Sequence, residues 1–400
     1  MSTDKFIPTI WSARILAALE KQLVYTKFFN RDYEGEIRDA GDTVKIGLVG
    51  APTVKKYTKG TDIAAPDDVT VTDATLSIDQ ADYFNIAVDD VDAAQSKINL
   101  LESASSQTGY AFGDVTDKYL AGLLVTGTGG TIGAKAGSTI TADAPLKILN
   151  LYTPPAEVDL IGRAAFDRFS EHADLAYLEQ LCTYMQGIDY SAYRGVVLLH
   201  GSDTLTYTAA LLAHLLPDKP LVLVAAGTPP EAPGSNALPN LDLAVQYLLS
   251  GAKDGVQIAY DGLHPAWATT EADCNDRFHH ASVPFVPVQA PVFHRRRILQ
   301  ITPHPGIDYG VFDLTGVDAV LHRMYHSATV PEPATAFAHR CKEAGVPCLF
   351  VTPKPAVAYV TAAHLPGIWT STTPESAFAK LLLTNEQDFD TMTLQVNENR

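Results

Sequence analysis

The chain has 400 residues and a formal net charge of −17, which is long enough for two or three domains with cores of their own. Residues 1–122 and the remainder both carry an acidic excess, which argues against nucleic-acid binding through phosphate neutralisation. Proline and charged residues interrupt the richest apolar stretch, 209–226, so we expect no membrane span.

The first 122 residues change pattern along their length. Residues 12–29 repeat apolar side chains on one face of a helix and predict an amphipathic helix. A polar segment rich in Gly, Asp and Lys follows, and the alternation at Val69–Thr72 predicts strands. The pattern is helical again from about 88 to 124.

Strands and helices alternate from residue 123 onward. The predicted strands are 123–125, 196–200, 221–225 and 256–260, and the predicted helices are 173–185, 206–216 and 240–249. This alternation predicts an α/β fold with a doubly wound sheet. The proline-rich segment 284–291 suits an interdomain connection. A smaller βα unit follows, with strands 319–321 and 348–351 around a helix at 334–344.

Two apolar strands end abruptly in glycines and hydroxyl residues. The first runs into Thr126–Gly133 (TGTGGTIG), and the second runs into His200–Thr204 (HGSDT). Ligands of open α/β sheets bind at the carboxyl ends of the strands. We therefore expect one site with hydroxyl nucleophiles and backbone N–H donors around them.

These two motifs resemble the TGGTI and HGTDT signatures of the bacterial-type asparaginase/glutaminase family, with Ser202 where threonine is usual. Weaker matches follow in the family's order at 166–171, 218–224, 235–241 and 325–329. The resemblance covers about 123–390. It implies a large α/β domain at 123–290, a smaller C-terminal α/β domain at 298–390, and hydrolysis of L-asparagine or a related amino-acid amide without metal or cofactor.

The resemblance also implies roles for three catalytic candidates. Thr131 is the expected nucleophile, Ser202 a second hydroxyl that attacks or positions water, and Asp203 the partner of the substrate α-ammonium. Each has a structural alternative, because a threonine after glycines suits a turn and an aspartate after a strand often caps a helix.

Four further residues are expected to bind the substrate. Ser170 and Glu171 match the end of the family segment that holds the substrate α-carboxylate, although an N-cap serine followed by a first-turn acid is the more common explanation. Gly130 and Gly201 would let backbone N–H groups approach the ligand closely.

Two family features are missing. The segment 261–271, where a lysine usually assists the second hydroxyl, contains none, and His264 is the candidate substitute base. The predicted active-site flap, 135–144, lacks the usual tyrosine, and Tyr152 is the nearest one. A weak enzyme, or a relative that only binds an amino acid, is the alternative reading.

Residues 1–122 resemble a different family, the tailed-phage major capsid proteins. The resemblance is to their N-terminal arm, extended loop and long spine helix, and it covers only about the first third of such a protein. It implies a structural role with virion association. No linker separates this segment from the enzyme-like part, so the two join as in a fusion.

Assembly and location follow from the remaining features. The asparaginase resemblance implies a homodimer or homotetramer in which 304–308 and 325–329 serve a neighbour's site. Arg295–Arg297, the one basic run, is read as a solvated linker or a subunit contact. Four cysteines without zinc or redox spacing predict reduced, mostly buried thiols in a cytoplasmic protein: Cys182, Cys274, Cys341 and Cys348.

Overall fold

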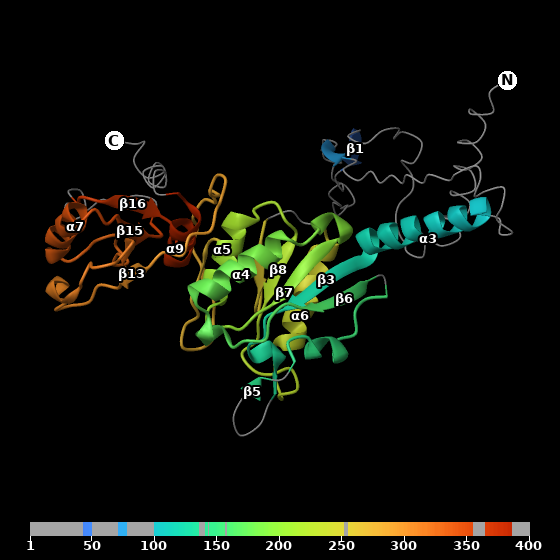
Figure 1. Cartoon of the computed structure of the whole chain (residues 1–400), viewed down its shortest axis with the longest axis horizontal. Coiled ribbons are helices and arrows are strands. Elements are labelled where there is room, and N and C mark those ends of the chain that lie inside the picture. The colour runs from blue at the N-terminus through green and yellow to red at the C-terminus, as the bar shows by residue number, and fades with distance from the viewer. Residues whose placement is uncertain are drawn as a thin grey trace, which may run out of the picture. The chain divides into compact units, whose positions relative to one another are not determined.

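The computed structural model describes residues 43–49, 71–77, 100–135, 141–142, 144–156, 158–251, 255–354 and 365–385 (Figure 1). The chain divides into two compact units, Met1–Leu120 and Ala121–Arg400. Within the described ranges, every helix is too short or too polar to span a bilayer.

In the first unit, strand β1 (Thr43–Val49) pairs antiparallel with β2 (Val71–Ser77). Helix α3 (Leu100–Ala121) follows, and the chain then passes directly into strand β3 (Gly122–Gly127). The predicted strand near residue 70 is therefore present, and the predicted helix ends at 121 instead of 124. The predicted helix at 12–29 lies outside the described residues.

The second unit begins with a six-stranded sheet of order β10-β9-β8-β7-β3-β6. All neighbours are parallel except β10 and β9, which are antiparallel. Its strands are β3, β6 (Asp159–Ala164), β7 (Gly195–Leu199), β8 (Leu221–Val224), β9 (Gln257–Ala259) and β10 (Leu263–Pro265). The chain goes from β3 outward to β6 on one side and then to β7 on the other, so the strand order reverses between β3 and β7.

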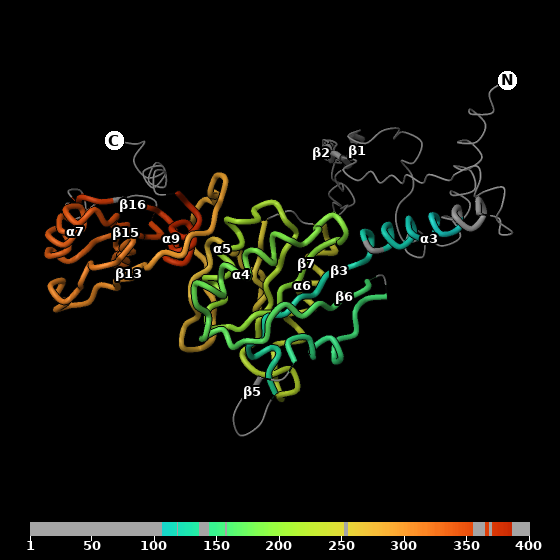
Figure 2. Tube along the Cα trace, in the orientation of Figure 1, coloured from blue at the N-terminus to red at the C-terminus, as the bar shows by residue number. Residues whose placement is uncertain are grey.

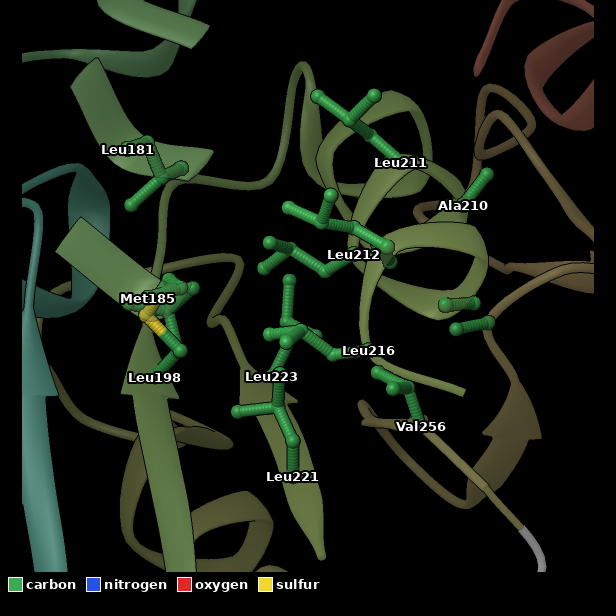
Figure 3. Close-up of a cluster of buried hydrophobic side chains, with 14 of the residues drawn as sticks. Leu181, Met185, Leu198, Ala210, Leu211, Leu212, Leu216, Leu221, Leu223 and Val256 are labelled. Carbon is green, nitrogen blue, oxygen red and sulfur yellow. The ribbon is translucent and has the colours of Figure 1, made fainter. Parts of the chain in front are cut away.

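Side chains of the central strands alternate between two cores, one on each face of this sheet. Leu124, Leu198 and Leu223 pack with helices α4 (Leu175–Gln186) and α5 (Leu205–Leu215), as Figure 3 shows for several of these residues. Leu123, Val197 and Val222 pack on the opposite face with helix α6 (Ala237–Leu249) and the 3-10 turn η4 (Lys147–Asn150). Both faces are covered, which is why these strands read as continuous apolar runs.

A second sheet follows in the C-terminal part, drawn in orange and red in Figure 2. Its strands are all parallel and lie in sequence order: β13 (Ile298–Ile301), β14 (Ala319–Arg323), β15 (Cys348–Thr352) and β16 (Ile368–Ser371). Helix α7 (Pro333–Glu343) packs on one face of this sheet and helix α9 (Pro374–Leu383) on the other. The α/β prediction is confirmed for the described residues from 121 to 385.

Short two-stranded pairs complete the described part. Strands β4 (Ala134–Lys135) and β5 (Thr141–Ala142) pair at the two ends of the predicted flap. Strands β11 (Thr269–Thr270) and β12 (His279–His280) form a hairpin after β10. The 3-10 turns are η3 (Thr131–Gly133), η5 (Ser170–His172), η6 (Tyr190–Ala192) and η7 (Tyr309–Val311).

The basic run 295–297 is predicted to be a solvated linker or a subunit contact, and two of its side chains, Arg295 and Arg297, are indeed exposed. Arg295 hydrogen-bonds Glu179 through Nε at 2.7 Å, and Arg297 lies 3.5 Å from Asp318. Arg296 is buried and donates to the carbonyl oxygens of Leu381 and Thr384 at the end of α9. Each guanidinium therefore has a partner within the chain. These partners belong to α4 of the large-sheet domain and to α9 and the residue before β14 in the C-terminal part, so the run contacts both parts.

The predicted burial of most of the cysteines is confirmed. Cys182, Cys341 and Cys348 are buried, Cys274 is exposed, and all four are free thiols.

Candidate active site at the carboxyl ends of β3 and β7

The candidate site lies where the strand order of the large sheet reverses. Strands β3 and β7 are parallel neighbours, with Val125 opposite Val197 and Gly127 opposite Leu199. Their carboxyl ends therefore meet at one edge, between connections that leave in opposite directions. This is the position at which open α/β sheets form a ligand crevice.

The loop after β3 is tied to the last residue of β7. The backbone N–H of Thr128 donates to the Leu199 oxygen at 3.0 Å, and its hydroxyl donates to the same oxygen at 3.1 Å. Gly129 and Gly130 follow with φ of 89° and 78°, in the left-handed region that favours glycine. Thr131 then begins η3 and is half-buried.

The loop after β6 runs beside the first loop. The N–H groups of Ala165 and Phe166 both donate to the Gly127 oxygen at 3.1 Å, and the Arg168 N–H donates to the Thr128 oxygen at 3.0 Å. These bonds bring Ser170 and Glu171, at the start of η5, to the edge formed by β3 and β7.

A third loop, which follows β7 and begins with His200 and Gly201, meets the loops after β3 and β6. Glycines make the closest contacts between these three loops. A Cβ added to Gly130 would lie 2.3 Å from the Gly201 Cα, and one added to Gly201 would lie 2.3 Å from the Ser170 Oγ. The Thr204 hydroxyl also donates to the Ser170 oxygen at 3.1 Å. The first contact is with backbone and the second with the serine side chain, and a side chain on either glycine would force these loops apart.

Two carboxylates meet beside this contact. Partial burial raises the pKa of Asp203, and the charge of Glu171 and a hydrogen bond with Glu171 raise it further. A hydrogen bond with Ser170 acts in the opposite direction and lowers the pKa. Asp203 itself is exposed, so the pair can reach a ligand from solvent.

The structure thus places all seven candidate residues on the three loops that meet at this edge. Gly130, Gly201, Ser170, Glu171 and Asp203 are joined by the contacts described above. Thr131 follows Gly130 directly, and Ser202 lies between Gly201 and Asp203.

Sequence reasoning overlooked His200, which precedes Gly201. It is fully buried, and its Nδ1 lies 2.7 Å from the Gly201 carbonyl oxygen. Burial lowers its pKa to about 4, so the imidazole is neutral at pH 7. The signal in the sequence was a histidine that ends an apolar run.

His264 and Tyr152, the candidate replacements for the missing lysine and the missing flap tyrosine, lie away from this site. His264 is in β10, three strands from β7, which is about 14 Å at the usual strand spacing. Its Nε2 bonds to the Tyr260 carbonyl oxygen at 3.0 Å. The Tyr152 hydroxyl donates to Asp242 of α6 at 2.7 Å, which ties it to that helix. The structure therefore gives no support to His264 as a base at Ser202 or to Tyr152 as a flap residue.

Comparison with known proteins supports the asparaginase resemblance for the second unit. Residues 122–298 match the family model described as asparaginase, N-terminal. This match begins at the first residue of β3. The capsid resemblance of residues 1–122 remains a prediction.

Curated relatives share part of the chain. A glutamyl-tRNA(Gln) amidotransferase subunit from Pyrococcus furiosus is 25% identical over 216 residues, which cover 52% of this chain and 48% of that protein. The L-asparaginase of Thermococcus kodakarensis is 31% identical over 166 residues, covering 34% of this chain and 43% of that protein. The chain thus spans about half the length of the curated relatives that it matches.

Two solved structures share the fold. L-asparaginase I from Vibrio cholerae matches with a TM-score of 0.54 and 22% identity, covering 65% of this chain and 91% of that one. The thermostable L-asparaginase from Thermococcus kodakarensis matches with a TM-score of 0.53 and 20% identity, with the same coverage.

Proposed function

We propose that the asparaginase-type domain at residues 122–298 makes this chain an amidohydrolase, which hydrolyses L-asparagine or a related amino-acid amide to the acid and ammonia. One observation carries the proposal: three loops converge at the β3/β7 edge through the contacts of Gly130, Gly201 and Ser170. In the proposed reaction, Thr131, the residue after Gly130, supplies the attacking hydroxyl, and the carboxylates of Asp203 and Glu171 bind an ammonium group.

The proposed reaction has two halves. In the first, the Thr131 hydroxyl oxygen attacks the amide carbon, the C–N bond breaks, and the proton lost by the hydroxyl ends on the leaving nitrogen, which departs as ammonia. In the second, water attacks the resulting ester carbon and releases the acid and the free Thr131 hydroxyl. Ser202 positions that water. Backbone N–H groups after β3 and β7 stabilise the oxyanion in both halves.

Substrate binding falls to the carboxylate pair and its neighbours. Asp203 and Glu171 accept hydrogen bonds from the substrate α-ammonium, and Ser170 donates to its α-carboxylate. A cation between the two carboxylates relieves the repulsion that raises the pKa of Asp203. This chemistry favours a free amino acid over a simple amide.

We expect this enzyme to be slow. The segment 261–271 supplies no lysine, and Lys147, an alternative amine close to η3 in the fold, is held by Glu231 at 3.0 Å. General acid–base assistance typically contributes about 10²–10⁴-fold in rate, so its loss leaves a weak activity. A chain that binds the amino acid without turning it over is the limiting case.

The test is ammonia release from L-asparagine, L-glutamine and propionamide by the purified full chain. Turnover of an amino-acid amide above buffer, with none of propionamide, supports the proposal. Absence of turnover with all three, together with absence of L-aspartate binding in calorimetry, contradicts it. Binding of L-aspartate without turnover identifies the amino-acid-binding alternative.

A second candidate is supported by the names of the relatives. Several are glutamyl-tRNA(Gln) amidotransferase subunits, among them those from Pyrococcus furiosus and from Thermococcus kodakarensis. This chain would then release ammonia for a partner protein, and full activity would require that partner. Stimulation of the amidase on addition of a lysate fraction, followed by identification of the protein in it, tests this candidate.

Assembly is part of the proposal. We expect a homodimer or homotetramer in which 304–308 and 325–329 complete a neighbour's site, as the asparaginase resemblance implies. Light scattering on the full chain measures the state, and a monomer with full activity contradicts the shared site. Shells in electron microscopy would instead favour the capsid-related role of residues 1–122.

A further inference from the structure

We propose that His200 is a positioning residue, which holds the peptide between Gly201 and Ser202 so that the Ser202 N–H faces the reacting carbonyl. The inference rests on the proposed amidohydrolase function. It concerns a side chain that touches no substrate and acts through the backbone of its neighbours.

The first step concerns which ring nitrogen carries the proton. Nδ1 lies 2.7 Å from the Gly201 carbonyl oxygen, and a carbonyl oxygen can only accept a hydrogen bond. Nδ1 must therefore carry a proton. Because burial lowers the pKa of His200 to about 4, the ring holds a single proton at neutral pH. Nε2 is then a bare acceptor, and it is buried without a hydrogen-bond partner among the described residues.

The second step concerns the direction of the next N–H. A trans peptide is planar, and its C=O and N–H point in opposite directions. The described part of the chain contains no cis peptide. Since the Gly201 C=O points at the buried imidazole, the Ser202 N–H points away from it, and no partner for this N–H lies among the described residues.

The third step concerns the rigidity of this peptide. Gly201 is packed against both Gly130 and Ser170, with 3.3 Å between the Gly130 Cα and a Cβ built on Gly201. On its other side, the His200 N–H donates to the Val224 oxygen of β8 at 2.8 Å. Contacts therefore fix the position of Gly201, but its single bonds still allow the following peptide to rotate. The Nδ1–H bond restrains this rotation, because it holds the Gly201 carbonyl oxygen against the buried ring.

A misdirected N–H would affect the transition state more than the bound substrate. Preorganised donors act where charge develops, and loss of one oxyanion donor typically costs about 10²–10³-fold in kcat. The amino-acid end of the substrate is held by other residues, Asp203 and Glu171. We therefore expect loss of the His200 bond to lower kcat while KM changes little.

The experiment compares His200→Asn with His200→Leu. Asparagine places an N–H donor where histidine has Nδ1, whereas leucine fills the space without a donor. His214→Leu is the matched control, because His214 is also fully buried, with one ring nitrogen bonded to Ser376 and the other unpartnered. It lies in the last turn of α5, remote from the loop after β7.

We expect His200→Leu to lower kcat for L-asparagine about 10²-fold, with KM changed less than about 3-fold. His200→Asn should keep kcat within about 10-fold of the wild type. His214→Leu should lower Tm without this effect on kcat. Equal kcat losses in all three variants, or an unchanged kcat in His200→Leu, would overturn the proposal.

A second measurement is independent of turnover. Nitrogen-15 NMR of histidine-labelled full chain identifies the His200 tautomer, with the signal assigned by its loss in His200→Asn. A neutral ring protonated on Nδ1 supports the bond, and a ring protonated on Nε2 overturns it. If the wild type releases no ammonia, the proposed function fails, and the tautomer alone decides whether His200 holds the Gly201 carbonyl.

Discussion

Gly130 and Gly201 touch backbone to backbone at the carboxyl ends of neighbouring strands. A methyl group on Gly130 would lie 2.3 Å from the Gly201 Cα and 2.5 Å from its nitrogen. Backbone atoms cannot move aside as a flexible side chain can, so the contact fixes the distance between the loops that follow β3 and β7.

Alanine at Gly130 should therefore both destabilise the fold and abolish activity. Gly130 has φ of 78° and ψ of −170°, a backbone conformation that is essentially limited to glycine and costs about 1–3 kcal/mol for another residue, and overpacking adds about 1–3 kcal/mol. Gly234→Ala is the matched control, because Gly234 has φ of 76° but nothing within 4 Å of a built Cβ. We expect a larger fall in the free energy of unfolding for Gly130→Ala, measured by urea denaturation. Equal losses would show that only the backbone angle matters.

Thr131→Ala should remove turnover and leave the fold intact. Loss of a nucleophile can cost up to about 10⁶-fold, so ammonia release should fall to the buffer rate. Thr131→Ser keeps the hydroxyl and should retain measurable kcat. L-aspartate binding and Tm serve as controls for folding. Full activity in Thr131→Ala would rule out this residue as the nucleophile.

As the pH is lowered, amino-acid binding should begin to weaken at a higher pH than it would if Asp203 had the pKa of an ordinary aspartate. Asp203 must be ionised to bind an ammonium group, and its pKa is raised by burial and by Glu171. Affinity for L-aspartate should therefore fall as the pH falls through this raised pKa. Calorimetry across the acid range gives the midpoint.

Glu171→Gln should move that midpoint to lower pH, because the variant removes the neighbouring charge but leaves the burial. The plateau affinity should also fall, since Glu171 is itself a proposed ligand of the ammonium group. A midpoint that does not move would contradict the pairing of the two carboxylates.

Lys380 in α9 should make stability depend on pH above neutrality. Burial lowers its pKa from 10.5 to about 8. Between these values the unfolded chain binds more protons than the folded chain, so stability should rise with pH across this window. Lys380→Met should remove this rise and increase the free energy of unfolding at pH 7 by on the order of 2–3 kcal/mol. The exposed lysine Lys342 of α7 provides the control, because Lys342→Met should change neither.

The sequence predicted the central strands well because both faces of the sheet are covered. A short continuous apolar run such as Val196–Leu199 is typical of a strand that is buried on both faces. The edge strand β6 was missed for the opposite reason: Asp159–Ala164 is mostly exposed and carries charge, so it lacks the pattern of a strand. Its place in the sheet comes from pairing with β3.

The candidate site was predictable in part. Its residue types follow from the two motifs, but the contact of Gly201 with Ser170 depends on how the loop after β6 crosses the edge. Arg296 shows the same limit, since a basic run gives no sign that its central residue is buried against the end of α9. Such contacts join positions far apart in sequence and depend on tertiary packing.

Helix α9 contributes side chains to two hydrophobic cores at once. Ala377 and Leu381 pack under the four-stranded sheet, while Ala379, Leu382 and Leu383 pack with α5 in the core of the six-stranded sheet. Neither sheet can lose this helix without exposing apolar surface of the other. The two domains are therefore thermodynamically coupled, and residues 121–385 should melt in a single cooperative transition, with no species in which one domain alone is unfolded.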